Sequence, residues 1–229
     1  MSRLKQVFFA GAGGTGKTSV TTAVDKLNAM GIPTYFMGSV SRSFFQSRGI
    51  TTEQAGLERE EEDRLTFQVD LFHHYLESLE QQREKAVQDG YEVFVCDRSP
   101  YDHLSFCIYN APNLMSRELL DHLWSQANAV VFPSPETDLL TPLQTYIVHF
   151  QDGLSWMQDA VVSDGMRWAP PAKNFIVDAI LRKLMWRAAC ELDDADRFMT
   201  LGESTVEQRI RAVVGMVLYD ELCSANSDL

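Results

Sequence analysis

The first stretch that could do chemistry is residues 11–18, which read G-A-G-G-T-G-K-T and match the pattern G-x-x-x-x-G-K-[ST] at every fixed position. Glycines in such a loop let phosphate oxygens approach the main chain, and its successive N–H groups then form a cradle of partial positive charge. The lysine adds a full charge beside the terminal phosphates, and the hydroxyl that follows is placed to ligate Mg²⁺. The alternative is a glycine-rich turn followed by a chance Lys-Thr pair. The complete match favours a site for a nucleoside triphosphate.

The residues expected to bind ATP are Gly11, Gly13, Gly14, Thr15, Gly16, Lys17, Thr18 and Ser19. Within this set Lys17 is also a catalytic candidate, and Thr18 is a candidate ligand of Mg²⁺. The loop lies between an apolar run at residues 7–10, which indicates a buried strand, and residues 19–27, which indicate an amphipathic helix. A strand before the loop and a helix after it are the context that this motif requires.

A second group of chemical residues lies in V-F-V-C-D-R-S-P at residues 93–100. Four apolar residues followed by an aspartate place Asp97 at the carboxyl end of a strand, the edge at which open α/β sheets bind ligands. Asp97 could hold Mg²⁺ or accept a proton from an attacking hydroxyl, and Arg98 could bind phosphate oxygens with two hydrogen bonds. The alternative is an aspartate that binds its own loop and pairs with the arginine at the surface.

The stretch D-R-S-P-Y-D-H-L-S-F at residues 97–106 resembles the D-R-[SYG] or E-R-S signature of P-loop nucleoside and nucleotide kinases. That superfamily includes thymidylate kinases, deoxynucleoside kinases and an AAA-type ATPase/kinase branch related to nicotinamide riboside kinase. In the last branch the pattern continues as D-x-L-x-[YF], which Asp102, Leu104 and Phe106 match. The resemblance implies that Asp97 is a catalytic base or metal partner, that Arg98 contacts a phosphate, and that Asp102 is among the substrate-binding residues.

The same resemblance implies a lid at residues 151–190, in which S-D-G-M-R at residues 163–167 matches a D-G-x-R element. Arg167 is the first candidate for a lid cation that stabilises the migrating phosphoryl group. The alternatives on the helix that follows are Lys173, Arg182, Lys183 and Arg187. On the acceptor side, Arg42 follows the second predicted strand and Gln68 lies on a long helix. We expect both to bind substrate, against the alternatives of a surface arginine and an exposed helix residue.

Five apolar runs predict the strands that must position these residues, and helical stretches separate them. The runs are 6–10, 33–37, 92–96, 145–150 and 197–201, with 129–132 as a competing candidate for the fourth. Strands that alternate with helices predict an α/β fold with a mainly parallel sheet and helices on both faces. We expect a single P-loop kinase domain over residues 1–229.

The long helical stretch at residues 53–88 is charged and has a period of 3.6 residues. Its pattern places five apolar residues on one side, and we expect that side to face the core. They are Leu65, Val69, Phe72, Leu76 and Leu79. After the fifth strand, Ser204 or Thr205 could cap a helix, or the loop that contains them could pack on the base of the donor nucleotide.

Composition limits the classes of partner. The formal net charge of −12 repels nucleic acid, although a local basic groove could still exist on an acidic protein. No apolar run approaches the ~20 residues that span a bilayer, and the N-terminus does not resemble a signal peptide, so we expect a cytoplasmic protein without a membrane partner. The four cysteines have no metal-ligand spacing. A homodimer is possible, because many members of the superfamily dimerise.

The sequence thus predicts an ATP- and Mg²⁺-dependent phosphotransferase that acts on a nucleoside, a nucleotide or a similar small acceptor. One alternative is a kinase of a modified base in DNA, like the hydroxymethyl-pyrimidine DNA kinases that phages encode, although the net charge disfavours it. Another is a regulatory P-loop ATPase without an acceptor. A GTPase would need an N-K-x-D element to recognise guanine, and the sequence contains none.

Overall fold

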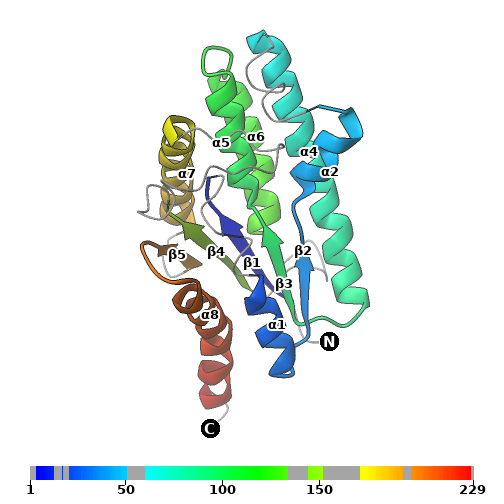
Figure 1. Ribbon diagram of the computed structural model, residues 1–229, viewed down its shortest axis with the longest axis vertical. Coiled ribbons are helices and arrows are strands. Elements are labelled where there is room, and N and C mark those ends of the chain that lie inside the picture. The colour runs from blue at the N-terminus through cyan, green and yellow to red at the C-terminus, as the bar shows by residue number, and fades with distance from the viewer. Residues whose placement is uncertain are drawn as a thin grey trace.

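The computed structural model describes residues 4–12, 17, 21–50, 60–133, 144–151, 171–192 and 197–227. Its centre is a parallel five-stranded sheet in the order β2-β3-β1-β4-β5 (Figure 1). The strands are β1 (Lys5–Ala10), β2 (Thr34–Met37), β3 (Val93–Asp97), β4 (Gln144–Phe150) and β5 (Phe198–Leu201). All five predicted strands are confirmed to within one residue at each end, because strands buried on both faces are nearly continuous apolar runs.

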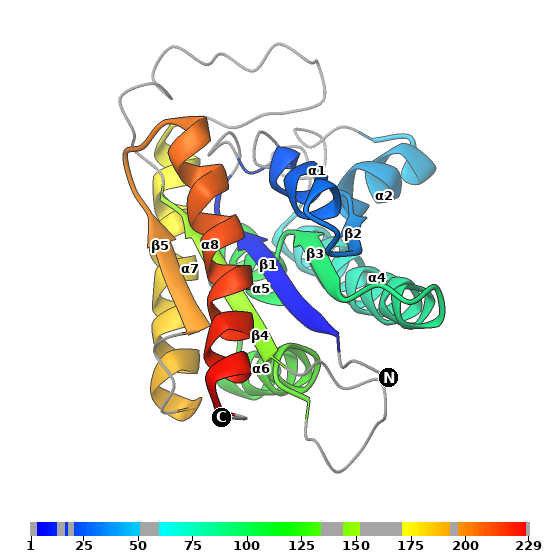
Figure 2. The same cartoon turned by 90° about the horizontal axis from the view of Figure 1, so that it is seen from below.

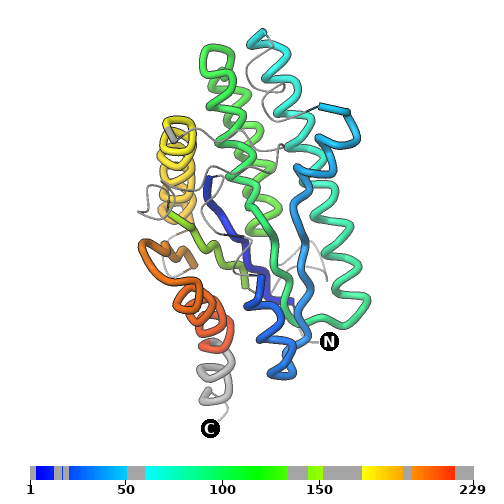
Figure 3. The backbone as a smooth tube through the Cα atoms, viewed as in Figure 1, coloured from blue at the N-terminus to red at the C-terminus, as the bar shows by residue number. Residues whose placement is uncertain are grey.

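Helices cover both faces of this sheet (Figure 2). They are α1 (Thr22–Ala29), α2 (Val40–Arg48), α4 (Glu61–Gln88), α5 (Pro100–Asn110), α6 (Arg117–Val131), α7 (Pro171–Leu192) and α8 (Val206–Ser227). Helices α1 and α8 pack on one face, and α4, α5, α6 and α7 pack on the other. The tube in Figure 3 follows the same path from β1 at the centre of the sheet to the C-terminal helix α8. The predicted α/β class is confirmed.

The alternation of side chains along β1 divides the core in two. Val7 and Phe9 pack with residues of α1 and α8, whereas Phe8 and Ala10 pack with residues of α4, α5 and α6. Successive residues of a strand point to opposite faces, so a central strand that is apolar throughout serves both layers. This arrangement fixes β1, and with it the start of the phosphate loop, from both sides.

The buried side of α4 differs in part from the prediction. Phe72 and Leu79 are buried, but Leu65, Val69 and Leu76 are only half-buried. Six buried residues of α4 lie outside that predicted set: Phe67, Gln68, Leu71, Tyr75, Arg83 and Ala86. The reason is that α4 packs against α2 as well as against the sheet, and the Phe67 ring lies 5.3 Å from that of Phe44.

Residues 129–131, which competed as a strand, form the last turn of α6, and Phe132 is its C-cap. The helix pattern therefore prevails over the local β propensity of Val130 and Val131. In the ranges that the structure describes, no helix is both long enough and apolar enough to span a membrane.

The shifted buried side of α4 can be tested by truncating one leucine that the prediction missed and one that it included. Leu71→Ala should lower the free energy of unfolding by about 3 kcal/mol, because Leu71 is buried against α2. Leu76→Ala should cost about 1 kcal/mol, since Leu76 is only half-buried. Urea denaturation measures both values. A larger loss for Leu76 than for Leu71 would contradict the packing of α4.

Candidate phosphate-binding and transfer site

The site lies at the carboxyl ends of β1 and β3, which are neighbours in the sheet. Phe9 of β1 pairs in register with Asp97 of β3, so Gly11 and Arg98 leave the two strands side by side. On the other flank, Ala10 pairs with His149 of β4. Because all the strands are parallel, their carboxyl ends meet at one edge, and this edge receives the phosphate loop. The topology therefore brings together the two motifs that the sequence singled out.

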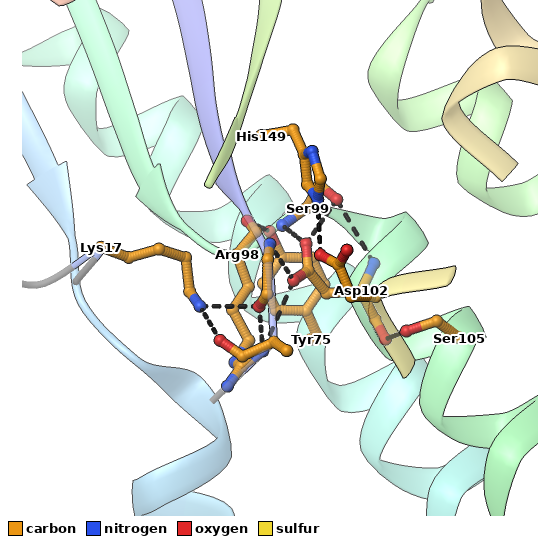
Figure 4. A network of polar contacts seen from close by, with 10 residues as sticks. Lys17, Tyr75, Arg98, Ser99, Asp102, Ser105 and His149 are labelled. Carbon is orange, nitrogen blue, oxygen red and sulfur yellow. Dashed lines mark hydrogen bonds and ion pairs between the residues drawn. The ribbon is translucent and has the colours of Figure 1, made fainter. Parts of the chain in front are cut away.

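Lys17, Arg98 and Asp102 come together at one point of the site (Figure 4), where each forms a hydrogen bond with the backbone of Gly11. Its carbonyl oxygen accepts hydrogen bonds from Lys17 Nζ at 2.6 Å and from Arg98 Nη1 at 3.3 Å. Lys17 Nζ also donates to the Ala12 carbonyl at 2.6 Å, and the lysine is 6% exposed. Gly11 has a φ of 146°, a conformation that side chains disfavour, so this position favours glycine. Two cations from different elements thus converge on one carbonyl at the start of the loop.

Asp102 connects the phosphate loop to the turn after β3. Its Oδ1 accepts hydrogen bonds from the Gly11 N–H at 2.9 Å and from Arg98 Nη1 at 3.4 Å. Its Oδ2 accepts from the Ser99 N–H at 2.8 Å and from Ser99 Oγ at 2.6 Å. The residue is fully buried. We predicted Asp102 as a substrate-binding residue; its burial and its four protein donors favour a positioning role instead.

The local sequence explains why Asp102 lies there. In S-P-Y-D the serine is the N-cap of α5, the proline is at the first helical position, and the aspartate at the third completes a capping box. Ser99 Oγ accepts from the Asp102 N–H at 3.3 Å, while the aspartate returns a bond to the cap. Both halves of this motif are local and favourable, so the turn after β3 has one strongly preferred conformation.

The backbone of Arg98 is strained. Its φ of 101° lies in the left-handed region, where a residue with a side chain costs about 1–3 kcal/mol. Two hydrogen bonds hold it: the Arg98 N–H donates to the Phe9 carbonyl at 2.9 Å, and Tyr75 Oη donates to the Arg98 carbonyl at 2.6 Å. Burial raises the pKa of Tyr75 well above its ordinary value, so the hydroxyl remains protonated and can donate. This conformation directs the guanidinium toward Gly11.

Tyr75 of α4 is buried in the core. What was missed is its hydroxyl, which reaches from α4 to the turn after β3. The ring of Tyr75 also stacks on that of His103, with 4.3 Å between the centroids. Burial lowers the pKa of His103 to about 3, so the imidazole is neutral near pH 7 and packs as a flat, uncharged ring. No local signal could have revealed this contact, because it joins two helices.

The other predicted residues lie as follows. Asp97 is half-buried at the end of β3, Arg42 is exposed on α2, and Gln68 is buried on α4. Seven of the predicted residues lie outside the described part of the chain: Gly13, Gly14, Thr15, Gly16, Thr18, Ser19 and Arg167. The structure therefore brings together Gly11, Lys17, Asp97, Arg98 and Asp102, while Arg42 and Gln68 lie on the helices beside β2 and β3.

The alternative cations on α7 have different surroundings. Arg182 pairs with Asp178 at 3.1 Å, and Arg187 pairs with Glu191 at 2.7 Å. Lys183 is exposed. Lys173 differs from these three, because it is buried and lies next to aromatic residues of α5.

A buried hydrogen bond that sequence reasoning missed lies at the end of β4. His149 Nε2 is 2.7 Å from Asp178 Oδ1 of α7, and both side chains are almost completely buried. Arg182 binds the second oxygen of Asp178. The pair joins the carboxyl end of β4 to α7, and the two residues are far apart in the chain. Such a contact depends on the packing of α7 against the sheet.

The loop after β5 is held by its own helix. The buried Arg209 of α8 donates to the Gly202 carbonyl at 3.0 Å and to Ser204 Oγ at 3.1 Å. Thr205 Oγ1 accepts from the Gln208 N–H at 3.2 Å, and the Gln208 side chain accepts from the Thr205 N–H at 2.8 Å. Of the two capping alternatives, Thr205 is therefore the residue that caps α8, whereas Ser204 Oγ accepts a hydrogen bond from Arg209.

Removing the charge of Asp102 tests its positioning role. Asp102→Asn should lower the free energy of unfolding by about 3 kcal/mol, because an amide cannot accept from all of the donors that face the carboxylate. Asp70→Asn is the matched control, since Asp70 is an exposed partner of Arg48 at 3.5 Å, and it should cost under about 1 kcal/mol. Chemical denaturation measures both. Equal losses would refute the positioning role.

The hydroxyl of Tyr75 can be tested against a second buried tyrosine. Tyr101 Oη donates to Asn128 on α6, away from the phosphate loop. Tyr75→Phe and Tyr101→Phe should each cost about 1–2 kcal/mol of stability. Only Tyr75→Phe should weaken ATP binding, by about three- to tenfold, because it releases the strained conformation of Arg98. Calorimetric titration with ATP measures this effect, and the same affinity in both variants would contradict it.

Comparison with known proteins bears on the family and the fold. A protein-family model described as an AAA domain matches residues 6–144, which is more than half of the chain. No curated protein matches the chain. A thymidylate kinase from Candida albicans superposes with a TM-score of 0.62 at 12% identity, over 96% of this chain and 94% of that chain. A thymidylate kinase from Ehrlichia chaffeensis superposes with a TM-score of 0.55 at 11% identity, over 93% and 99%. The chain belongs to the AAA domain family, and its fold is similar to that of the two thymidylate kinases.

Proposed function

We propose that this protein is a P-loop phosphotransferase that moves the γ-phosphoryl group of ATP to a nucleoside, a nucleotide or a related small acceptor. The observation that carries the proposal is the convergence of Lys17 and Arg98 on the Gly11 carbonyl. One cation belongs to the phosphate loop and the other to the turn after β3, so an anion at this point would contact both motifs. Membership of the AAA domain family and the thymidylate kinase fold support the proposal.

On the donor side, Lys17 would exchange its two carbonyl acceptors for the oxygens of the β- and γ-phosphates. The exchange favours the phosphates, because the full negative charge of a phosphate oxygen attracts the ammonium more strongly than the dipole of a carbonyl does. The loop residues predicted from sequence, residues 11–19, would supply the N–H groups of the cradle. Asp102 fixes the first of these residues through the Gly11 N–H.

Mg²⁺ would be held by Asp97 and by the hydroxyl of Thr18. Among the described residues no cluster of three or more His, Cys, Asp or Glu side chains could hold a metal ion. One half-buried carboxylate at the strand end still fits Mg²⁺, which usually keeps several waters and binds one or two carboxylates together with substrate phosphates. Bound there, the ion would neutralise charge on the phosphates.

For the transfer itself, Asp97 would orient the acceptor hydroxyl or phosphate and take its proton, if it carries one. The acceptor oxygen forms a bond to the γ-phosphorus while the bond from that phosphorus to the β-phosphate oxygen breaks, so ADP leaves with the bonding electrons. Arg98 would bind the equatorial oxygens as charge moves across them, and Arg167 is the predicted second cation. Positioning and electrostatics supply most of the acceleration in such reactions.

On the acceptor side, Arg42 and Gln68 stay our candidates. The exposed Arg42 on α2 could bind an acceptor phosphate. Gln68 on α4 could recognise the base of an acceptor through hydrogen bonds. Two solved structures of similar fold are those of thymidylate kinases, which favours a nucleotide among the possible acceptors. A regulatory ATPase is the second candidate, because the matching family is described only as an AAA domain.

Lys17→Ala should abolish ADP formation in the presence of acceptor, with a loss of at least about 10²–10³-fold, because the loop loses the charge that binds the transferred group. Lys26→Ala is the control, since Lys26 is an exposed partner of Glu207 and should leave the rate unchanged. Activity near that of the unaltered protein in Lys17→Ala would refute the assignment.

A panel of nucleosides, nucleotides and oligonucleotides, scored for ADP with and without each compound, identifies the acceptor. Phosphotransfer requires that one compound raise ADP formation and gain the phosphate. Phosphate release that is equally fast without any of them would instead favour the ATPase.

A further inference from the structure

A cavity of about 310 Å³ lies between α7 and the edge strand β5. On the sheet side it is lined by His149 of β4 and by Phe198 and Thr200 of β5. His149 pairs in register with Thr200, and Ile147, two residues earlier on β4, pairs with Phe198. All these side chains therefore project from the same face of the sheet, the face on which α7 packs.

The helix side of the cavity is one stripe of α7. The residues that form it are Arg182, Met185, Trp186 and Ala189, at positions i, i+3, i+4 and i+7 of the helix. Three of the four are apolar, and the indole of Trp186 offers a flat surface on which an aromatic ring can pack. The helix therefore supplies a largely apolar wall.

The exposure of the lining residues shows which end of the cavity is open. Trp186 is 69% exposed and Thr200 is exposed, whereas His149 is fully buried. The cavity thus runs from solvent beside Trp186 to an inner end at His149. Pockets that bind small molecules have volumes of about 300–1,000 Å³, so this cavity suits a ligand of one or two rings.

A polar atom of the residue at the inner end lacks a partner. His149 Nε2 lies 2.7 Å from Asp178 Oδ1, so in the neutral imidazole the proton belongs on Nε2 and Nδ1 is an acceptor. Nδ1 is buried and has no hydrogen-bond partner among the described residues. A buried acceptor without a donor is unfavourable, and a ligand that brought a donor would remove that cost.

The charges beside the cavity already balance each other. The almost completely buried carboxylate of Asp178 accepts from His149 and pairs with Arg182 Nε at 3.1 Å. A cation in the cavity would compete with the arginine for this carboxylate, and an anion would be repelled by it. The surroundings therefore favour an uncharged ligand.

We propose that this cavity binds a small uncharged aromatic molecule that carries an N–H or O–H donor. The ring lies against Trp186 and Phe198, and the donor binds His149 Nδ1. Indoles and phenols share this chemistry. The inference does not depend on the proposed phosphotransfer, because none of the described residues of the transfer site lines the cavity.

The test is a chemical-shift titration of the ¹⁵N-labelled protein with indole, 1-methylindole, phenol and anisole. The two methylated probes keep the rings but have no donor. One hydrogen bond changes a Kd by about three- to tenfold, so indole or phenol should bind that much more tightly than its methylated counterpart. Comparing indole with phenol identifies the preferred ring. The amide shifts should centre on Ala189 and Thr200, and saturating ATP should leave the Kd unchanged.

Two variants assign the binding to this cavity. Ala189→Leu fills it and should weaken binding by at least about tenfold. Ala179→Leu is the matched control and should have no effect, because both alanines are half-buried on α7 but only Ala189 lines the cavity. His149→Gln keeps a donor for Asp178 but has no acceptor in the place of Nδ1. In that variant each donor probe should bind no better than its methylated counterpart.

Equal affinity of each donor probe and its methylated counterpart for the unaltered protein would overturn the inference, and this comparison requires no variant to fold. A lack of binding by all four probes would also overturn it and leave water as the occupant. So would full binding to Ala189→Leu, once thermal unfolding has shown that the variant is folded. Displacement of the probe by ATP or thymidine monophosphate would instead assign the aromatic molecule to the transfer site.

Discussion

The hydrogen bond from the Gly11 amide to the buried carboxylate of Asp102 is the interaction on which the site depends. It joins the loop after β1 to the turn after β3, and the same carboxylate holds Ser99 and Arg98. A buried carboxylate is stable only when hydrogen-bond donors surround it. The Asp102 carboxylate therefore fixes the positions of the groups that donate to it. The carbonyl oxygen of Gly11 accepts hydrogen bonds from Lys17 and Arg98, the two cations that we propose bind a phosphate.

The distribution of charge explains how an acidic protein could bind an anion. The net charge is −12, yet Lys17 and Arg98 lie at the carboxyl ends of the central strands. At distances beyond about 8–10 Å in physiological salt most of the surface charge is screened, whereas groups inside a poorly solvated site are not. Such a protein repels a long polyanion but can still bind a small one. The chemistry of the site and the overall charge therefore favour the same class of ligand.

The strained backbone of Arg98, at the carboxyl edge of the sheet, depends on buried contacts. The left-handed backbone of Arg98 persists because β1 and α4 each hold one of its peptide groups, through the Phe9 carbonyl and the Tyr75 hydroxyl. Helix α4 also carries Gln68 two turns before Tyr75 and packs on α2, which carries Arg42. A shift of α2 or α4 would therefore move the Tyr75 hydroxyl, and with it the backbone and the guanidinium of Arg98. This gives a physical route by which acceptor binding could act on the phosphate site.

Five strands and the α/β class could be predicted from the sequence alone, because each strand is a short and nearly continuous apolar run. The phosphate-loop motif and the Asp97–Arg98 pair were recognised in the same way, as local patterns next to strand ends. The sequence did not determine the rotation of α4 or the positions of Tyr75 and Lys173. The sequence pattern predicted Asp102 as a substrate-binding residue, and the structure shows it buried with the Gly11 N–H as one of its donors. These features depend on contacts between elements that are far apart in the chain. A local pattern specifies which residue type a position holds, but only the packing of helices on the sheet decides which polar atoms meet.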